Sequence, residues 1–196
     1  MKKIKIENVC LHDQFDGHSD IKENLISLLL KANAEELEEK EHRHKIELPY
    51  NIKRSDWQTS TDEDREWVNY FTPYLRKNFD RMLDEIGFDT NYVIKNLWFQ
   101  HYIKSNIHNW HTHSDNYTGV YYLKFDGQAK TQLLNTYNNE LINIDSKEGD
   151  LIIFPSSIVH RCPRVHTEKI IISFNFEVAS FTKKFKKFMK DSFTND

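Results

Sequence analysis

The chain has 196 residues, of which 38% are hydrophobic and 29% charged, a balance typical of a folded domain rather than a disordered chain. A net charge of −3 gives no general attraction to nucleic acid, and no apolar run reaches the ~18 residues of a membrane span, so neither is expected as a partner. Two cysteines, and an N-terminus without the apolar core of a signal peptide, fit a reducing cytoplasm. We expect one domain over residues 1–196, with a helical part (1–91), a strand-rich core (92–179) and a basic amphipathic C-terminal helix (180–196).

Two helical patterns dominate the first half of the chain. The first runs from residue 21 to about residue 42, where an apolar stripe is followed by a charged run expected to face solvent. The second opens at the acidic, cap-like residues 60–64 and extends to Gly87, a typical helix stop. Pro73 lies inside this second pattern, so we expect a kink or a division into two helices there.

From about residue 92 the hydrophobic period changes to that of strands. Turn signals at residues 126–127 and 148–149 separate short apolar runs, as in a sandwich or jelly-roll barrel. The expected strands cover residues 97–103, 109–114, 117–125, 130–135, 141–144, 150–154, 159–164 and 170–178. The last segment carries a stripe of phenylalanines that we expect to pack on the barrel, with its lysines in water.

The histidines at positions 111 and 113 predict a metal site. Residues two apart on a strand point the same way, so His111 and His113 can present imidazoles to one point, and Asp115 would follow on that side. His160, which follows a turn and a buried strand, can supply the third ligand from a distant part of the chain. Neutral imidazoles suit Fe(II), Zn(II) or Cu(II) at neutral pH.

The final strand indicates a second, anionic ligand. If it stays regular, Lys169, Ile171, Ser173 and Asn175 share its inner face. A lysine on such a face is costly to bury without a partner, and an anion would be a good one. The alternative is that Lys169 pairs in solvent with Glu168 or Glu177, an interaction of little energetic value.

Taken in order, these motifs resemble the 2-oxoglutarate/Fe(II)-dependent dioxygenase superfamily. The similarity is greatest to the short bacterial and phage 2OG-Fe(II) oxygenases of family 5, which are related to prolyl 4-hydroxylases. It covers roughly residues 97–178, and it is carried by residues 108–113, 118–123 and 149–155, by His160 and by residues 169–175. The fold that this resemblance implies is α+β and mainly β: a double-stranded β-helix, or cupin-like jelly roll, with supporting N-terminal helices.

The resemblance also implies ligands. His111 and His160 would be the first and last iron ligands, and the middle ligand, usually a carboxylate, would be His113, or Asp115 if that residue bends inward. The distal carboxylate of 2-oxoglutarate would be held by Lys169, where the superfamily more often has arginine. The residues expected to assist at the cofactor site are Tyr122, Ser173, Asn175 and Tyr102.

The implied activity is an Fe(II)- and 2-oxoglutarate-dependent hydroxylation that consumes O2. Its substrate would be a small molecule or a peptide, with a prolyl or other protein side chain favoured by the resemblance. Two alternatives stay open: a three-histidine cupin-like dioxygenase that does not use 2-oxoglutarate, and a non-catalytic β-module that binds metal or ligand. The sequence does not indicate the oligomeric state.

Overall fold

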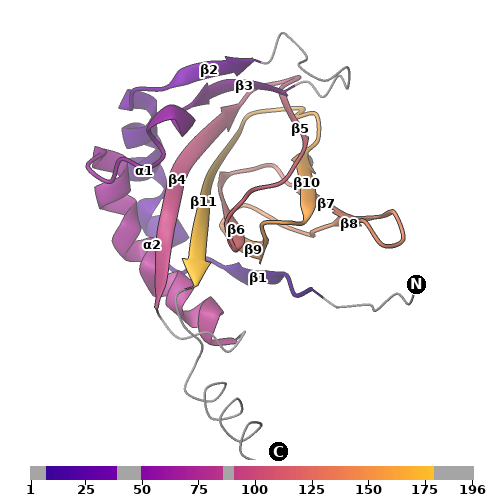
Figure 1. Cartoon of the computed structure of the whole chain (residues 1–196). Coiled ribbons are helices and arrows are strands. Elements are labelled where there is room, and N and C mark those ends of the chain that lie inside the picture. Colours follow the sequence, from indigo (N-terminus) through magenta and orange to yellow (C-terminus); the bar gives the residue numbers. More distant parts are fainter. Residues whose placement is uncertain (1–7, 39–49, 86–90, 179–196) are drawn as a thin grey trace, which may run out of the picture.

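The computed structural model describes residues 8–38, 50–85 and 91–178. Within them the strands form one curled, antiparallel, 11-stranded sheet in the order β1-β9-β6-β11-β4-β3-β5-β10-β7-β8, with β2 paired to β3 (Figure 1). The helical elements are α1 (His18–Lys31), η1 (Trp57–Thr59) and α2 (Glu66–Glu85). The strands are β1 (Leu11–Gln14), β2 (Glu35–Glu38), β3 (Tyr50–Ser55), β4 (Tyr92–Tyr102), β5 (Ile107–His111), β6 (Tyr117–Lys124), β7 (Gln132–Asn135), β8 (Glu140–Asn143), β9 (Asp150–Pro155), β10 (Val159–Cys162) and β11 (Lys169–Val178).

Strand β11 separates two hydrophobic cores. Ile170, Ile172 and Phe174 belong to the core beneath α1 and α2, which lie along the outer side of β4 and β11 (Figure 1). Ile171 belongs to a second core inside the curl, as the alternation of side chains along a strand requires. The face that was predicted to carry Lys169, Ile171 and Ser173 is therefore the inner one.

The curl of the sheet depends on β3, which bridges its two halves. Its C-terminal end pairs with β4 and its N-terminal end with β5. Strand β5 then pairs with β10 so that His111 lies directly opposite His160. The sheet thus brings two histidines that are far apart in the sequence onto neighbouring strands.

One glycine allows the helix-side core to close. A Cβ atom on Gly119 would lie only 2.1 Å from the ring of Phe174 on the paired strand β11. That separation is far inside van der Waals contact, so the ring occupies space that any side chain on β6 would need. The absence of a side chain at Gly119 therefore allows the Phe174 ring of β11 to lie against the backbone of β6.

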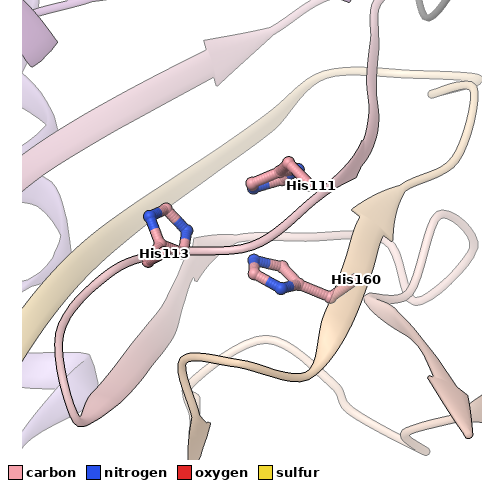
Figure 2. Close-up of side chains that lie close together, drawn as sticks. All are labelled: His111, His113 and His160. Carbon is pink, nitrogen blue, oxygen red and sulfur yellow. The ribbon is translucent and has the colours of Figure 1, made fainter. Parts of the chain in front are cut away.

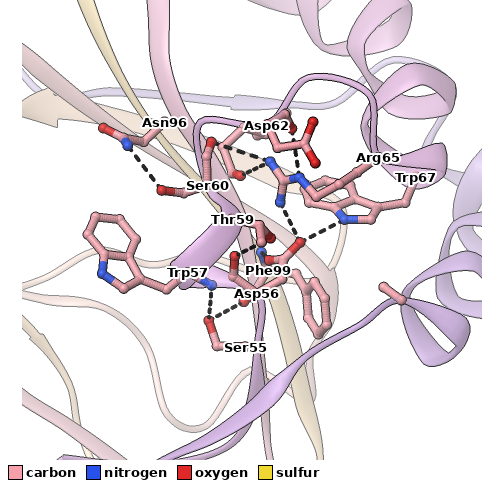
Figure 3. A network of polar contacts seen from close by, with 12 residues as sticks. Ser55, Asp56, Trp57, Thr59, Ser60, Asp62, Arg65, Trp67, Asn96 and Phe99 are labelled. Carbon is pink, nitrogen blue, oxygen red and sulfur yellow. Dashed lines mark hydrogen bonds and ion pairs between the residues drawn. The ribbon is translucent and has the colours of Figure 1, made fainter.

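A buried polar network joins η1, α2 and β4 (Figure 3). The carboxylate of Asp56 accepts hydrogen bonds from Trp67 Nε1 (2.8 Å) and Phe99 N (2.9 Å), and it forms an ion pair with Arg65. Arg65 in turn donates to Leu97 O at 2.6 Å. Burial raises the pKa of the Asp56 carboxyl, whereas these donors oppose that shift. The network anchors the start of α2 to the central strand.

All eight expected strands are present. Their ends differ from the expected ones by at most three residues, except that β4 begins at Tyr92, five residues before the expected start. The first helix prediction is wrong from Ala32 to Glu38, because Ala32 turns into extended backbone and Glu35–Glu38 forms β2; the rest of the predicted helix lies outside the described residues. Pairing with β3 outweighs the helix propensity of these glutamates. The N-terminal part is also less helical than expected, because β1 and β3 come from it as well.

The expected division into two helices at Pro73 is wrong. Helix α2 continues through the proline, although Pro73 lacks the N–H that would bond to the carbonyl of Asn69. Phe71, Leu75 and Phe79 are fully buried on either side of it, and their packing on the sheet outweighs the missing bond. The predicted C-terminal helix lies outside the described residues, and within them no helix is long and apolar enough to cross a membrane.

Candidate metal centre

Three imidazoles converge inside the curl of the sheet (Figure 2). One ring nitrogen from each of His111, His113 and His160 lies within 4.8 Å of those of the other two. His111 ends β5, His160 lies on β10, and His113 follows β5, where its backbone N–H donates to Ser156 O at 3.0 Å. That bond extends the strand-like backbone past His111, so that the side chains of His111 and His113 face the same side. The structure thus places the three predicted residues together.

Hydrogen bonds to the backbone fix the tautomers of two of these rings. His111 Nδ1 lies 2.6 Å from the carbonyl oxygen of Asn109, and His160 Nδ1 lies 2.8 Å from that of Ile158. A carbonyl oxygen can only accept, so each Nδ1 carries the proton. Each Nε2 is left with a lone pair, which is the form of histidine that binds a metal.

Burial keeps the rings neutral. Burial, followed by repulsion from the neighbouring His111, lowers the pKa of His113 to about 4 and that of His160 to about 3. The pKa of His111 is also lowered by burial. At neutral pH all three imidazoles are therefore unprotonated, and no proton must leave before a cation binds.

The cluster contains no carboxylate from the described residues. Asp115, the alternative middle ligand, is not among the groups that converge there. His113, and not Asp115, is therefore the third side chain of the cluster. Three neutral ligands would leave the full charge of a divalent cation uncompensated.

A fourth histidine, His108, packs against His111. His108 stacks on His111 with ring centroids 3.9 Å apart and planes 14° from parallel, and Gln100 Nε2 lies 3.2 Å from His108 Nδ1. Burial, and then the neighbouring histidines, lower the pKa of His108 well below its usual value. His108 falls in the segment 108–113 that carries the resemblance, whereas Gln100 was not predicted to lie at the site. Its alternation with Tyr102 on β4 was the available signal.

The histidines border a small cavity of about 30 Å³, roughly the space of one water molecule. It lies between the two halves of the curled sheet. Its lining comprises Trp98, Gln100, Tyr102, His108, His111, His113, Thr118, Val120, Thr131, His160, Arg161, Cys162, Ile171 and Ser173.

Lys169 is fully buried beside this cavity. Its Nζ donates to Ala129 O at 2.6 Å and lies 3.3 Å from Cys162 Sγ, with the ring centroid of Phe125 4.9 Å away. Among the described residues no carboxylate pairs with it. The alternative of a solvent ion pair is wrong, since Glu168 pairs with Lys124 and His101, and Glu177 with Lys95. The contacts of this buried ammonium are a carbonyl, a thiol and the rings of Tyr102, Tyr122 and Phe125. Among the described residues it therefore lacks a full negative counter-charge.

The other four residues expected at the cofactor site differ in their hydrogen bonds. Tyr102, paired directly with Lys169 across β4 and β11, has a buried hydroxyl without a hydrogen-bond partner among the described residues. Tyr122 donates its hydroxyl to Thr131 Oγ1 at 2.7 Å, so that hydroxyl is already engaged. Ser173 Oγ lies 3.5 Å from Gln100 Oε1, midway along the cavity.

Asn175 lies at the metal end of β11 rather than beside Lys169. Its Oδ1 accepts from Thr118 Oγ1 at 3.0 Å, and its Nδ2 lies 3.4 Å from His113 Nδ1. The amide oxygen and nitrogen are interchangeable in such a network, and the flipped orientation lets Oδ1 accept from a protonated Nδ1. All three histidines would then present Nε2. Asn175 thus contacts a candidate ligand.

Several solved structures share this fold. A 2OG-Fe(II) oxygenase family oxidoreductase from Burkholderia pseudomallei matches at a TM-score of 0.67 and 11% identity, over 89% of this chain and 88% of that chain. A prolyl hydroxylase from Trichoplax adhaerens, in complex with a hypoxia inducible factor peptide fragment, matches at 0.59 and 14%, over 89% and 84%. HygX from Streptomyces hygroscopicus, with nickel and 2-oxoglutarate bound, matches at 0.59 and 10%, over 90% and 85%.

No family model matches the sequence, and no curated protein matches it either. At identities this low, the structural likeness shows the fold alone: the chain has the jelly-roll fold of 2OG-Fe(II) oxygenases. The expected double-stranded β-helix is confirmed.

Proposed function

We propose that this protein is an Fe(II)- and 2-oxoglutarate-dependent oxygenase. His111, His113 and His160 would hold the metal, and Lys169 would hold the distal carboxylate of 2-oxoglutarate. The observation that carries the proposal is the presence, in and beside one cavity, of three neutral imidazoles and a buried ammonium without a counter-charge. A purely structural β-module has no need of either feature.

The three histidines fit a divalent transition metal. Imidazole nitrogen suits Fe(II), and two of the rings already carry their proton on the nitrogen that faces the backbone. Because all three ligands are neutral, the bound cation would keep its double positive charge. The carboxylate of 2-oxoglutarate that Lys169 does not hold would offset part of that charge, which supports 2-oxoglutarate as the partner.

Lys169 and Tyr102 fit the carboxylate end of that co-substrate. A carboxylate could accept from both Lys169 Nζ and the unpartnered Tyr102 hydroxyl, so it would satisfy the two polar groups that the protein leaves short. The cavity of about 30 Å³ is smaller than 2-oxoglutarate, so entry of the ligand requires nearby side chains to move apart. Lys169 would exchange its weak contacts for an ion pair.

With O2, the metal and 2-oxoglutarate would supply an oxidation of a substrate C–H bond that releases succinate and CO2. The protein's residues would orient the co-substrate through Lys169 and Tyr102 and keep water from the site. We propose hydroxylation as the reaction and a peptide or small molecule as the substrate. Support comes from two structures of the same fold, one with a bound peptide and one with 2-oxoglutarate.

One observation favours a second candidate. His113 stands where most of the superfamily has a carboxylate, and a three-histidine site is also what a cupin-like dioxygenase without 2-oxoglutarate would use. Such an enzyme gives no role to the buried ammonium of Lys169. The two candidates therefore differ in a single measurable property, the binding of 2-oxoglutarate.

That property is tested by titrating 2-oxoglutarate into the Fe(II)-loaded protein without oxygen, by calorimetry. Lys169→Met removes the charge and keeps the length of the side chain, and we expect its affinity to fall at least about tenfold. Lys95→Met, which removes an exposed lysine paired with Glu177, is the matched control and should bind like the wild type. Equal affinities for all three proteins would refute the role of Lys169, and an absence of binding would favour the second candidate.

A further inference from the structure

Cys162 is in direct contact with Lys169. Its Sγ lies 3.3 Å from Lys169 Nζ, and both side chains are buried, at 6% and 1% exposure. The contact follows from the fold, because Cys162 lies two residues after His160 on β10 and therefore faces the same side of the strand. The proposed reaction makes no use of this thiol.

The same thiol is reachable from the cavity. Cys162 lines the cavity that the three histidines border, and this cavity has roughly the volume of one water molecule. Hydrogen peroxide is little larger than water, so it can enter where a protein partner or glutathione could not. The second cysteine, Cys10, is exposed and is separate from this site.

We propose that Cys162 and Lys169 form a covalent sulfur–nitrogen cross-link when hydrogen peroxide oxidises the thiol. Three features favour the cross-link: the short distance between sulfur and nitrogen, the burial of both groups, and the absence, among the described residues, of a carboxylate that pairs with Lys169. A nucleophile already in contact reacts far faster than one that must diffuse to the site.

The chemistry takes place in two balanced steps. First the Cys162 sulfur attacks peroxide, an S–O bond forms as the O–O bond breaks, and the thiol becomes a sulfenic acid with release of one water. The amine form of Lys169 then attacks that sulfur. The S–N bond forms, the S–O bond breaks, and hydroxide leaves with a proton from the nitrogen as a second water. Peroxide is the only oxidant used, and a thiol reductant reverses the link.

The consequence rests on the proposed function. A cross-linked Lys169 has lost its ammonium charge and its freedom to reach a carboxylate, so it could no longer hold 2-oxoglutarate. Peroxide would therefore switch the co-substrate site off, and a thiol would restore it. The bond would also protect Cys162 from irreversible oxidation.

The test begins with the metal-free Cys10→Ser protein, in which Cys162 is the only thiol and no internal disulfide can form. After treatment with peroxide, we expect a peptide that joins Cys162 to Lys169, about 2 Da lighter than the sum of the two free peptides, and its loss on treatment with dithiothreitol. A gain of about 16 or 32 Da at Cys162, with Lys169 in a free peptide, would overturn the cross-link.

Two variants in the same background act as controls. With Lys169→Met the thiol has no amine beside it, so we expect a gain of about 32 Da, as in a sulfinic acid. With Cys162→Ser no cross-linked peptide is expected, and any gain of mass should lie on methionine. Formation of a cross-linked peptide in either variant would show that another group reacts, and would refute the assignment.

Titration of 2-oxoglutarate separates this inference from the function on which its consequence rests. The metal-free Cys10→Ser protein is oxidised first, freed of peroxide and then loaded with Fe(II) without oxygen. It should bind 2-oxoglutarate at least about tenfold more weakly than the reduced protein, and dithiothreitol treatment before loading should restore binding. If the cross-link forms but the reduced protein does not bind 2-oxoglutarate, the proposed function fails and the chemistry of the cross-link stands. If 2-oxoglutarate binds but no cross-link forms, the inference fails alone.

Discussion

At the scale of single residues, the site is prepared for a cation before any cation binds. His111 and His160 each donate Nδ1–H to the carbonyl two residues earlier, which leaves Nε2 as the free lone pair. Burial lowers the pKa values of the rings, so they stay neutral where an exposed histidine would begin to protonate. Tautomer and charge both agree with metal binding.

Removal of one imidazole should therefore abolish tight metal binding. We expect His111→Gln to weaken Fe(II) or Co(II) binding by at least about 100-fold, since a neutral amide is a poor replacement for a ring nitrogen. Asp115→Asn is the matched control, because Asp115 lies outside the cluster. A large loss of affinity in Asp115→Asn, measured by the same metal titration, would instead return the carboxylate to the ligand set.

The lowered pKa values also predict how the metal-free protein responds to acid. The folded pKa of His113 is about 4 and that of His160 about 3, both below the unfolded value of 6.5. The unfolded chain thus binds more protons below pH 6.5, and stability is lost as the pH falls from there toward the folded values.

Between about pH 6.5 and pH 5 each of these rings should cost the metal-free fold about 2 kcal/mol. Urea unfolding at both values measures the loss, which should be smaller in His160→Gln because one titrating group is gone. An equal loss in the variant would show that other groups dominate. The stability at higher pH should change little, since the rings are neutral in both states.

At the scale of elements, the strands from residue 92 onward were predictable because their apolar residues alternate or form short buried runs. Strands β2 and β3 were not, since they are short, and β2 is mostly charged. Their hydrogen bonds to β3 and β4, rather than their own sequence, decide their conformation. Helix α2 survives Pro73 for the same reason: contacts distant in sequence outweigh a local signal.

Gly119 gives a prediction for the packing of β6 on β11. Gly119→Ala should destabilise the protein by about 1–3 kcal/mol, because the added methyl group overlaps the Phe174 ring. Phe174→Leu removes that ring, so in this background Gly119→Ala should cost much less. Equal costs in both backgrounds, in a double-mutant cycle by urea unfolding, would show that the ring is not the obstacle.

The Asp56 network gives a second prediction for the elements. Asp56→Ala would leave the guanidinium of Arg65 and the N–H of Trp67 without their acceptor in a buried place, at a cost of about 3–5 kcal/mol. Asp62→Ala, on an exposed carboxylate nearby, is the control and should cost little. Similar costs for both changes in urea unfolding would mean that the network does not anchor α2.

At the scale of the whole molecule, the site exists because the sheet curls. Strand β5 meets β10 and brings His111 opposite His160, while β11 carries Lys169 and Ser173 on the face turned toward them. The spacing of the histidines, and of the residues on β11, predicted that His111, His113 and His160 would lie together with Lys169 nearby. It could not predict that Tyr102 has the unpartnered hydroxyl while that of Tyr122 bonds Thr131, or that Cys162 touches Lys169, because these depend on side-chain packing across strands.

If one cavity binds both a metal and 2-oxoglutarate, the protein should convert 2-oxoglutarate to succinate in the presence of O2. The Fe(II)-loaded protein is supplied with O2 and 2-oxoglutarate, and succinate is quantified alongside His160→Gln and Lys169→Met. We expect succinate from the wild type, none from His160→Gln, and a raised requirement for 2-oxoglutarate in Lys169→Met. Succinate formed equally by His160→Gln, or a wild-type protein that binds Fe(II) but neither binds nor consumes 2-oxoglutarate, would contradict the claim.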